Sequence, residues 1–126
     1  MAMPVYPLLH RHPVQISVRT RGLALSENLH RVIRGSVSAA IGRFSRRVQG
    51  VFVWVEDTNG PKGGRGMRCR MVIRLKQGGR LMVSAEATDE YAAVGRAANR
   101  ARARLVRRID RGRRARREAP ARTAAL

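Results

Sequence analysis

Hydrophobic residues alternate with polar ones in several short stretches of the chain, the pattern of a strand with one buried face. In the first stretch, Val14, Ile16 and Val18 are separated by polar side chains. Strands are therefore expected at residues 14–19, 51–57, 68–76 and 81–87. Between the last two lies the sequence QGGR, residues 77–80, which predicts the tight turn of a hairpin.

Two other segments place apolar residues at every third or fourth position, which is typical of an amphipathic helix. The first predicts a helix over residues 26–45, with Ser26 as its N-cap. The second predicts a helix over residues 89–111, capped by Thr88 and with acidic residues in its first turn. The stripe expected to face the core consists of Tyr91, Val94, Ala98, Ala101, Leu105 and Ile109.

These elements follow one another in the order β-α-β-β-β-α. Three consecutive strands predict an antiparallel meander, and both helices must cover the same face of the sheet to bury their apolar sides. We therefore expect an α+β fold, a two-layer sandwich of a four-stranded sheet with two helices on one face. The expected organisation is an irregular lead-in (1–13), one domain (14–112) and a basic, disordered tail (113–126).

The net charge points to a polyanionic partner. The 126 residues carry a formal charge of +19, while an apolar content of 44% is ordinary for a domain with a packed core. So large a charge repels itself in the folded protein unless an anion lies nearby. Nucleic acid is the favoured partner, because each neutralised phosphate releases counterions. An anionic membrane surface ranks second.

Membrane insertion and secretion find no support in the sequence. No stretch approaches the ~20 apolar residues of a spanning helix, and residues 1–13 lack the features of a signal peptide. The single cysteine, Cys69, cannot form an internal disulfide, which fits a reducing cytoplasm. We expect a cytoplasmic protein with no membrane partner.

Arginines dominate the polar side of the second predicted helix. At about 100° per residue, an arginine ridge lies opposite the apolar stripe; it consists of Arg96, Arg100, Arg104, Arg107 and Arg111. Like charges four residues apart repel each other, and almost no acids compensate them. The guanidinium fork also suits phosphate. The ridge is therefore predicted to bind RNA phosphates rather than to be a solvated helix face, and Arg108, on the flank of the stripe, is included in the site.

A second basic surface is expected on the open face of the sheet. Alternation in the third strand places Arg68, Arg70, Arg74 and Lys76 on that face, beside Phe52 and Trp54 of the neighbouring strand. Basic residues interleaved with aromatic ones resemble the platforms on which single-stranded RNA stacks. The alternative is that the lead-in covers the aromatic pair with Tyr6, Leu8 and Leu9. The sequence leaves both interpretations open.

Catalytic and metal chemistry are not expected. The glycine-rich segment NGPKGGRG, residues 59–66, lacks the GK[ST] ending of a phosphate-binding loop and leads into a strand. Cys69 alternates inward and is predicted to be a buried apolar residue. The acids form no convincing pair for acid–base work. The sequence therefore predicts no catalytic residues, no metal site, no cofactor and no small-molecule substrate.

Several segments resemble one known family. The stretches VQISVRTRGLALSENLHRVIRGSVSAAIGRF, VFVWVED and LMVSAEATDEYAAVGRAANRA resemble the ribosome hibernation-promoting factors. This family includes the ribosome-associated inhibitor A proteins and is also called the sigma-54 modulation proteins. The resemblance covers residues 14–111. It is most specific at SAEATDEYAAV, where Asp89, Tyr91 and the two following alanines match the family pattern and Val94 replaces isoleucine.

The resemblance implies a bacterial, non-enzymatic translation inhibitor of the stress response that binds small-subunit rRNA in the mRNA/tRNA channel. It implies a short form, monomeric off the ribosome, without the second domain of long members. Arg100, Arg107 and Arg111 match basic positions of the family's second helix, and Ala103 stands where the family has an arginine.

On the first helix, Ser36 and Ala39 stand where the family often carries lysines. The resemblance therefore implies that nearby arginines, Arg31 and Arg34 among them, replace those lysines in the RNA contact.

Two other functions stay open at the level of sequence. The first is a general RNA- or DNA-binding module without a defined ribosomal site, which mRNA and tRNA would not displace. The second is a regulator that contacts another protein through Phe52 and Trp54. Binding of that kind would depend little on salt.

Overall fold

The structure is a computed structural model, and it describes residues 14–59 and 66–118. Its elements are β1 (Gln15–Arg21), α2 (Glu27–Ile41), the 3-10 helix η1 (Gly42–Arg47), β2 (Val48–Asp57), β3 (Met67–Leu75), β4 (Arg80–Ala87) and α3 (Glu90–Glu118). Each predicted strand and helix is present, in the predicted order. Residues 1–13, which contain the predicted lead-in, lie outside the described residues.

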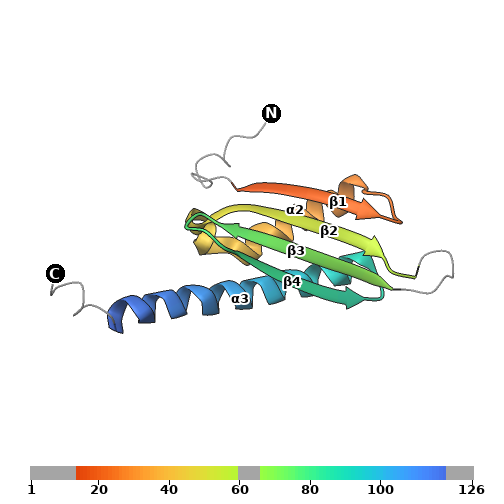
Figure 1. The fold of residues 1–126 in the computed structure, drawn as a ribbon. Coiled ribbons are helices and arrows are strands. Elements are labelled where there is room, and N and C mark those ends of the chain that lie inside the picture. Colours follow the sequence, from red (N-terminus) through yellow and green to blue (C-terminus); the bar gives the residue numbers. More distant parts are fainter. Residues whose placement is uncertain (1–13, 60–65, 119–126) are drawn as a thin grey trace, which may run out of the picture.

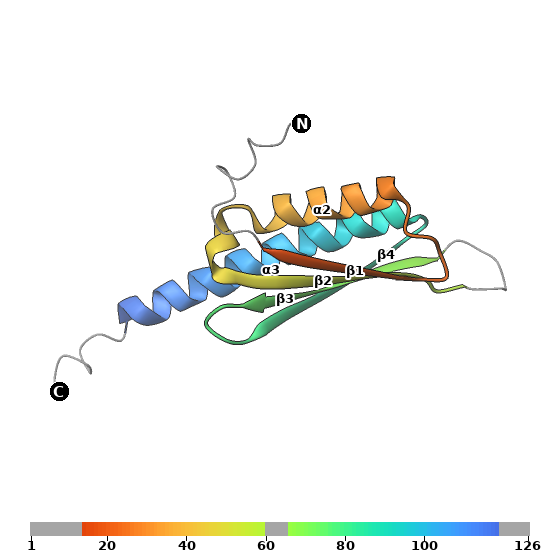
Figure 2. The ribbon, with the colours of Figure 1, turned by 90° about the horizontal axis from the view of Figure 1, so that it is seen from above.

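The four strands form one sheet in the order β1-β2-β3-β4 (Figure 1). β1 is parallel to β2, and β2, β3 and β4 form the predicted antiparallel meander. Both helices lie on the same side of the sheet (Figure 2). The predicted α+β two-layer sandwich is therefore confirmed. The order leaves β1 and β4 at the two edges of the sheet.

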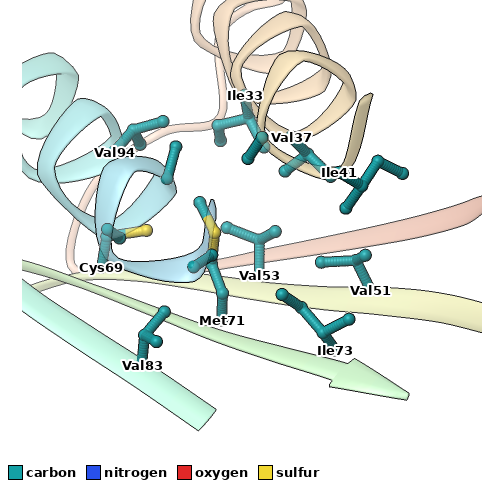
Figure 3. Packing of buried hydrophobic residues seen from close by; sticks show 14 of the residues in the cluster. Ile33, Val37, Ile41, Val51, Val53, Cys69, Met71, Ile73, Val83 and Val94 are labelled. Atoms are coloured by element: carbon teal, nitrogen blue, oxygen red, sulfur yellow. The ribbon is translucent and has the colours of Figure 1, made fainter. Parts of the chain in front are cut away.

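The core fills the space between the helices and one face of the sheet (Figure 3). The side chains of Val51, Val53 and Val55 in β2 are buried, as the alternation predicts. Helix α3 contributes mostly alanines to the core, and these small side chains allow the helix to approach β3 and β4 closely. Among the described residues, no polar or charged side chain is buried.

The first helix begins as predicted and ends earlier. The side chain of Ser26 accepts a hydrogen bond from the backbone N–H of Leu29 at 3.0 Å, so Ser26 is the N-cap. The α-helix stops at Ile41 because Gly42 adopts a positive φ of 37°. Residues up to Arg47 form a 3-10 helix that still buries Phe44. The predicted helix of residues 26–45 is therefore two elements.

The second helix differs from its prediction at both ends. Asp89, not Thr88, is the N-cap, since its Oδ1 accepts a hydrogen bond from the N–H of Ala92 at 2.8 Å. At the other end the helix continues to Glu118. The predicted disordered tail is therefore wrong for residues 113–118, where arginine and alanine, both strong helix formers, continue the helix. Residues 119–126 lie outside the described residues.

Candidate nucleic-acid interface

The buried face of α3 is wider than the predicted stripe and is turned toward β4. Ala93 and Ala97 are fully buried, although the stripe did not include them. Tyr91, which it did include, is 38% exposed and accepts a hydrogen bond from Asn28 Nδ2 of α2 at 3.0 Å. With the buried face shifted in this way, the arginine ridge lies on the flank of α3 beside β4. The predicted position opposite the core is wrong.

Three arginines of the ridge bind the free edge of β4 through its backbone. The donor–acceptor pairs are Arg96 Nη1 to Glu86 O at 2.9 Å, Arg100 Nη1 to Ser84 O, and Arg104 Nη1 to Met82 O at 3.2 Å. We call these three the edge arginines. Their side chains stay exposed, and each guanidinium keeps donors for another partner.

Helix and strand geometry explain the spacing of these contacts. Four residues of a helix rise about 6 Å, and two residues of a strand extend about 6.6 Å. Because α3 runs antiparallel to β4, every fourth helix residue meets every second carbonyl along the edge. The edge arginines thereby occupy acceptors that another strand would otherwise use.

The rest of the predicted α3 site divides into two parts. Arg107 and Arg111 are exposed and form no hydrogen bond or ion pair within residues 14–59 and 66–118. Arg107 lines a hollow with Met82, Val83 and Ser84 of β4, and the helix extends beyond the end of the sheet after Ile109, its last buried residue (Figure 1). Arg108 instead reaches the β3–β4 turn. Its Nη2 lies so close to Gly79 that a side chain at this position would collide with it.

Arg31 and Arg34 lie on the exposed side of α2. Arg31 Nη1 donates to Asn28 Oδ1 at 3.4 Å, and both arginines line a shallow hollow at the start of the helix. Helices α2 and α3 pack against each other, and Asn28 of α2 donates to the Tyr91 hydroxyl of α3. The predicted helix residues therefore lie on two neighbouring elements.

On the open face of the sheet, the strand register arranges the side chains in rows that cross the strands. One row, with Phe52 near its centre, consists of Ser17, Phe52, Val72 and Met82. The row on one side of it consists of Arg19, Trp54, Arg70 and Ser84. On the other side lies the turn-end row of Gln15, Gly50, Arg74 and Arg80. The outermost row, the paired-charge row, consists of Arg21, Glu56, Arg68 and Glu86.

Arg68 lies on the open face, as predicted, between two acids. Its Nη1 is 3.4 Å from Glu56 Oε1 and its Nη2 is 3.2 Å from Glu86 Oε2. Arg70 Nε is 3.9 Å from the same Glu56 oxygen. Positive charge on this part of the face is therefore compensated locally.

The turn-end row contains no acid. Arg74 lies directly opposite Arg80 across β3 and β4, and like charges in that position repel. The sequence analysis missed Arg80, although pairing around a tight turn at residues 77–80 would have placed it there. Lys76, predicted to lie on the strand, lies in the turn because β3 ends at Leu75. Its backbone N–H donates to the carbonyl of Arg47 at 2.9 Å.

The aromatic pair, Phe52 and Trp54, lies between the turn-end row and the paired-charge row. The ring centroids of Phe52 and Trp54 are 5.8 Å apart with an interplanar angle of 23°, which is a stacked arrangement. The Arg70 guanidinium lies 5.9 Å from the Trp54 ring on the neighbouring strand. Phe52 remains 38% exposed.

Other kinds of site find no support in the described ranges. They hold no group of three or more His, Cys, Asp or Glu side chains placed to bind a metal ion. None of the helices in these ranges is long and apolar enough to span a bilayer. Burial raises the pKa of the Cys69 thiol to about 12, so this side chain stays neutral.

The fold defines the class of this protein as a small two-layer α+β domain, and solved structures share it. A ribosomal subunit interface protein from Coxiella burnetii superposes with a TM-score of 0.68 at 13% identity, over 77% of this chain and 99% of that one. The N-terminal domain of Protein Y from Thermus thermophilus gives a TM-score of 0.61 at 18% identity, over 75% of this chain and 96% of that one.

The family of the chain is a more specific finding than its fold. The model of the sigma-54 modulation protein / S30EA ribosomal protein family matches residues 16–113. The chain therefore belongs to this family, whose members are ribosome-associated proteins without enzymatic activity. No curated protein sequence matches the chain at a significant level.

Proposed function

We propose that this protein is a translation inhibitor of the hibernation type, which binds RNA of the small ribosomal subunit in the mRNA/tRNA channel. Family membership supports a ribosomal partner. The similar Coxiella structure is described as a subunit interface protein, which supports a site between the subunits. In this proposal the domain is a cytoplasmic monomer when it is off the ribosome, and it inhibits translation by occupying the channel.

The observation that carries the proposal is the uncompensated charge of α3. Arg107 and Arg111 have no acidic partner in the described ranges, and they continue the line of the edge arginines along one flank of the helix. Arginines four residues apart repel each other unless an anion lies between them. A phosphate backbone supplies such anions at regular spacing.

The distribution of acids supports RNA binding at the C-terminal part of α3. Of the eight acids in the chain, most lie where both helices begin and where β2 and β4 end; they are Glu27, Glu56, Asp57, Glu86, Asp89 and Glu90. The opposite end, with the C-terminal part of α3 and the β3–β4 turn, is strongly basic. RNA phosphates are therefore attracted most strongly to that end.

Co-sedimentation with purified small and large ribosomal subunits tests the proposal. The protein should bind the small subunit saturably, and mRNA with initiator tRNA should displace it. The double substitution Arg107→Glu and Arg111→Glu should abolish binding, because it replaces two phosphate contacts with repulsion.

A matched control is available on the same helix. At about 100° per residue, Arg102 and Arg113 lie roughly opposite Arg107 and Arg111, and their replacement by glutamate makes the same change in charge. This control variant should keep its small-subunit binding. Equal loss in both double variants, or unsaturable binding to both subunits, would instead identify a general nucleic-acid-binding module.

A further inference from the structure

The open face of the sheet carries a hollow beside the aromatic pair, on the side away from the acids. It has a volume of about 380 Å³ and is lined by Phe52, Val72, Arg74, Gly79 and Arg80. Its floor is apolar and its rim is basic. The helices lie on the other face of the sheet (Figure 2), so this hollow is separate from the arginine ridge of α3.

The geometry points to an unpaired nucleotide of single-stranded RNA as the occupant, with its base stacked on Phe52 and its phosphates bound by Arg74 and Arg80. This inference rests on the proposed function only in that RNA is the partner. It adds a second contact surface and a preference for unpaired bases.

The ring of Phe52 is suited to stacking. Trp54 stacks against it at 5.8 Å, and Arg70 lies over Trp54, so Phe52 is held from one side. Its exposed part borders the hollow. A base that stacks there removes an exposed aromatic surface from water, and such stacking does not depend on base identity.

The rim supplies the charge that a nucleotide needs. Arg74 and Arg80 face each other across the strands and form no ion pair in the described parts of the chain. An anion between them relieves their mutual repulsion. The paired-charge row, with its two acids, lies at the other end of the face, so the RNA backbone is expected to follow the turn end of the sheet.

The hollow also adjoins the helix surface around the β3–β4 turn. Gly79 lines the hollow, and the guanidinium of Arg108 of α3 lies close to the same glycine. Basic side chains thus continue from the hollow toward α3 at this turn, where one RNA strand can contact both. A duplex hides the faces of its bases, so only unpaired nucleotides satisfy both the ring and the arginines.

Trp54 is the single tryptophan of the chain and reports directly on this face. In the full chain, an oligouridine of about ten nucleotides should quench Trp54 fluorescence saturably, and an RNA duplex of equal length should not. Phe52→Leu should weaken binding of the single strand about 5- to 150-fold, the range expected for one lost stacking contact. Arg74→Glu with Arg80→Glu, which leaves the aromatic ring in place, should abolish the quenching.

The control is the double variant Arg102→Glu and Arg113→Glu, which makes the same change in charge on α3 and should keep the quenching. Anisotropy of a labelled oligonucleotide measures total binding in parallel. Bound RNA without a change in Trp54 fluorescence would overturn this inference while leaving the proposed function intact. Normal quenching in a protein that fails to bind ribosomes would support this inference and contradict the proposed function.

Two further outcomes would assign the face to another occupant and overturn the inference. The first is equal quenching by a polyglutamate peptide of the same length, which would identify a site for acidic protein segments. The second is quenching by RNA only after Tyr6→Ser, Leu8→Ser and Leu9→Ser are introduced in the full chain, which would identify the N-terminal segment as the natural cover.

Discussion

Cys69 illustrates how a single residue responds to its place in the fold. It lies in β3, is fully buried, and points into the core toward the helices (Figure 3). Removal from water disfavours the charged thiolate, so burial raises the pKa of the thiol from 9.0 to about 12. A thiol that is neutral and inaccessible does not react, and Cys69 acts as a small apolar residue.

We expect Cys69 to resist alkylation in the native protein at about pH 8 and to react at the ordinary rate in denaturant. Between pH 9.0 and about 12 the unfolded thiol loses a proton that the folded one keeps. The contribution of Cys69 to stability is therefore complete below pH 9.0 and declines as the pH rises through this window. Mass spectrometry after labelling measures the reactivity.

Ser38→Cys in the Cys69→Ala background provides the control, because Ser38 is exposed on α2. That thiol should be labelled without denaturant. Rapid labelling of Cys69 in the native wild-type protein would contradict its burial.

At the scale of elements, the contact between α3 and β4 has two parts. Alanines and Leu105 of the helix pack on the sheet, and the edge arginines bind the outward carbonyls of the edge strand. An uncovered edge strand is a template for pairing with another chain. The edge arginines therefore protect β4 and hold their own guanidinium groups in a fixed row.

Replacement of Arg96, Arg100 and Arg104 by alanine should expose the edge of β4 and cause self-association. The effect should be strongest at high ionic strength, where salt screens the repulsion between positively charged molecules. Size-exclusion chromatography with light scattering measures the mass.

The control replaces Arg111, Arg113 and Arg114 by alanine, which removes the same charge from the same helix beyond its last buried residue, Ile109, and leaves β4 covered. It should remain monomeric. Identical masses for the two triple variants under all conditions would contradict the protective role of the edge arginines.

At the scale of the whole molecule, charge is distributed unevenly along the long axis. Acids collect where the helices begin, and the arginines of η1, of the β3–β4 turn and of the C-terminal part of α3 lie toward the other end. The core holds no buried polar side chain in the described ranges, so the charge lies at the surface. Such a field orients the protein on a polyanion before specific contacts form.

Binding to the small subunit should therefore weaken steeply with salt. For six to ten phosphate contacts, affinity should fall about 10³- to 10⁵-fold between roughly 50 and 200 mM salt. Arg107→Glu alone, which retains partial binding, should lower the slope of log K against log salt by about one. Sedimentation across a salt series measures this slope, and a slope unaffected by the substitution would exclude a phosphate contact at Arg107.

Local pattern was sufficient to predict the elements of this protein. Alternation in the strands and the three-to-four spacing in the helices depend only on near neighbours, so the order β-α-β-β-β-α and the inward faces of β2 and β3 could be derived from sequence. The errors lie at element ends. Gly42 ends α2 early because of its positive φ, and Asp89 rather than Thr88 accepts the capping hydrogen bond of α3.

The surroundings of the charged side chains were decided by tertiary structure. The sequence by itself determined that α3 carries a row of arginines and that β3 presents arginines on one face. Only the packing of α3 on β4 decided that the ridge lies beside an edge strand, with three members bound to its carbonyls. Only strand register decided that Arg68 lies between two acids while Arg74 faces Arg80. These differences arise between residues far apart in the chain, and periodicity within one segment carries no information about its neighbours in space.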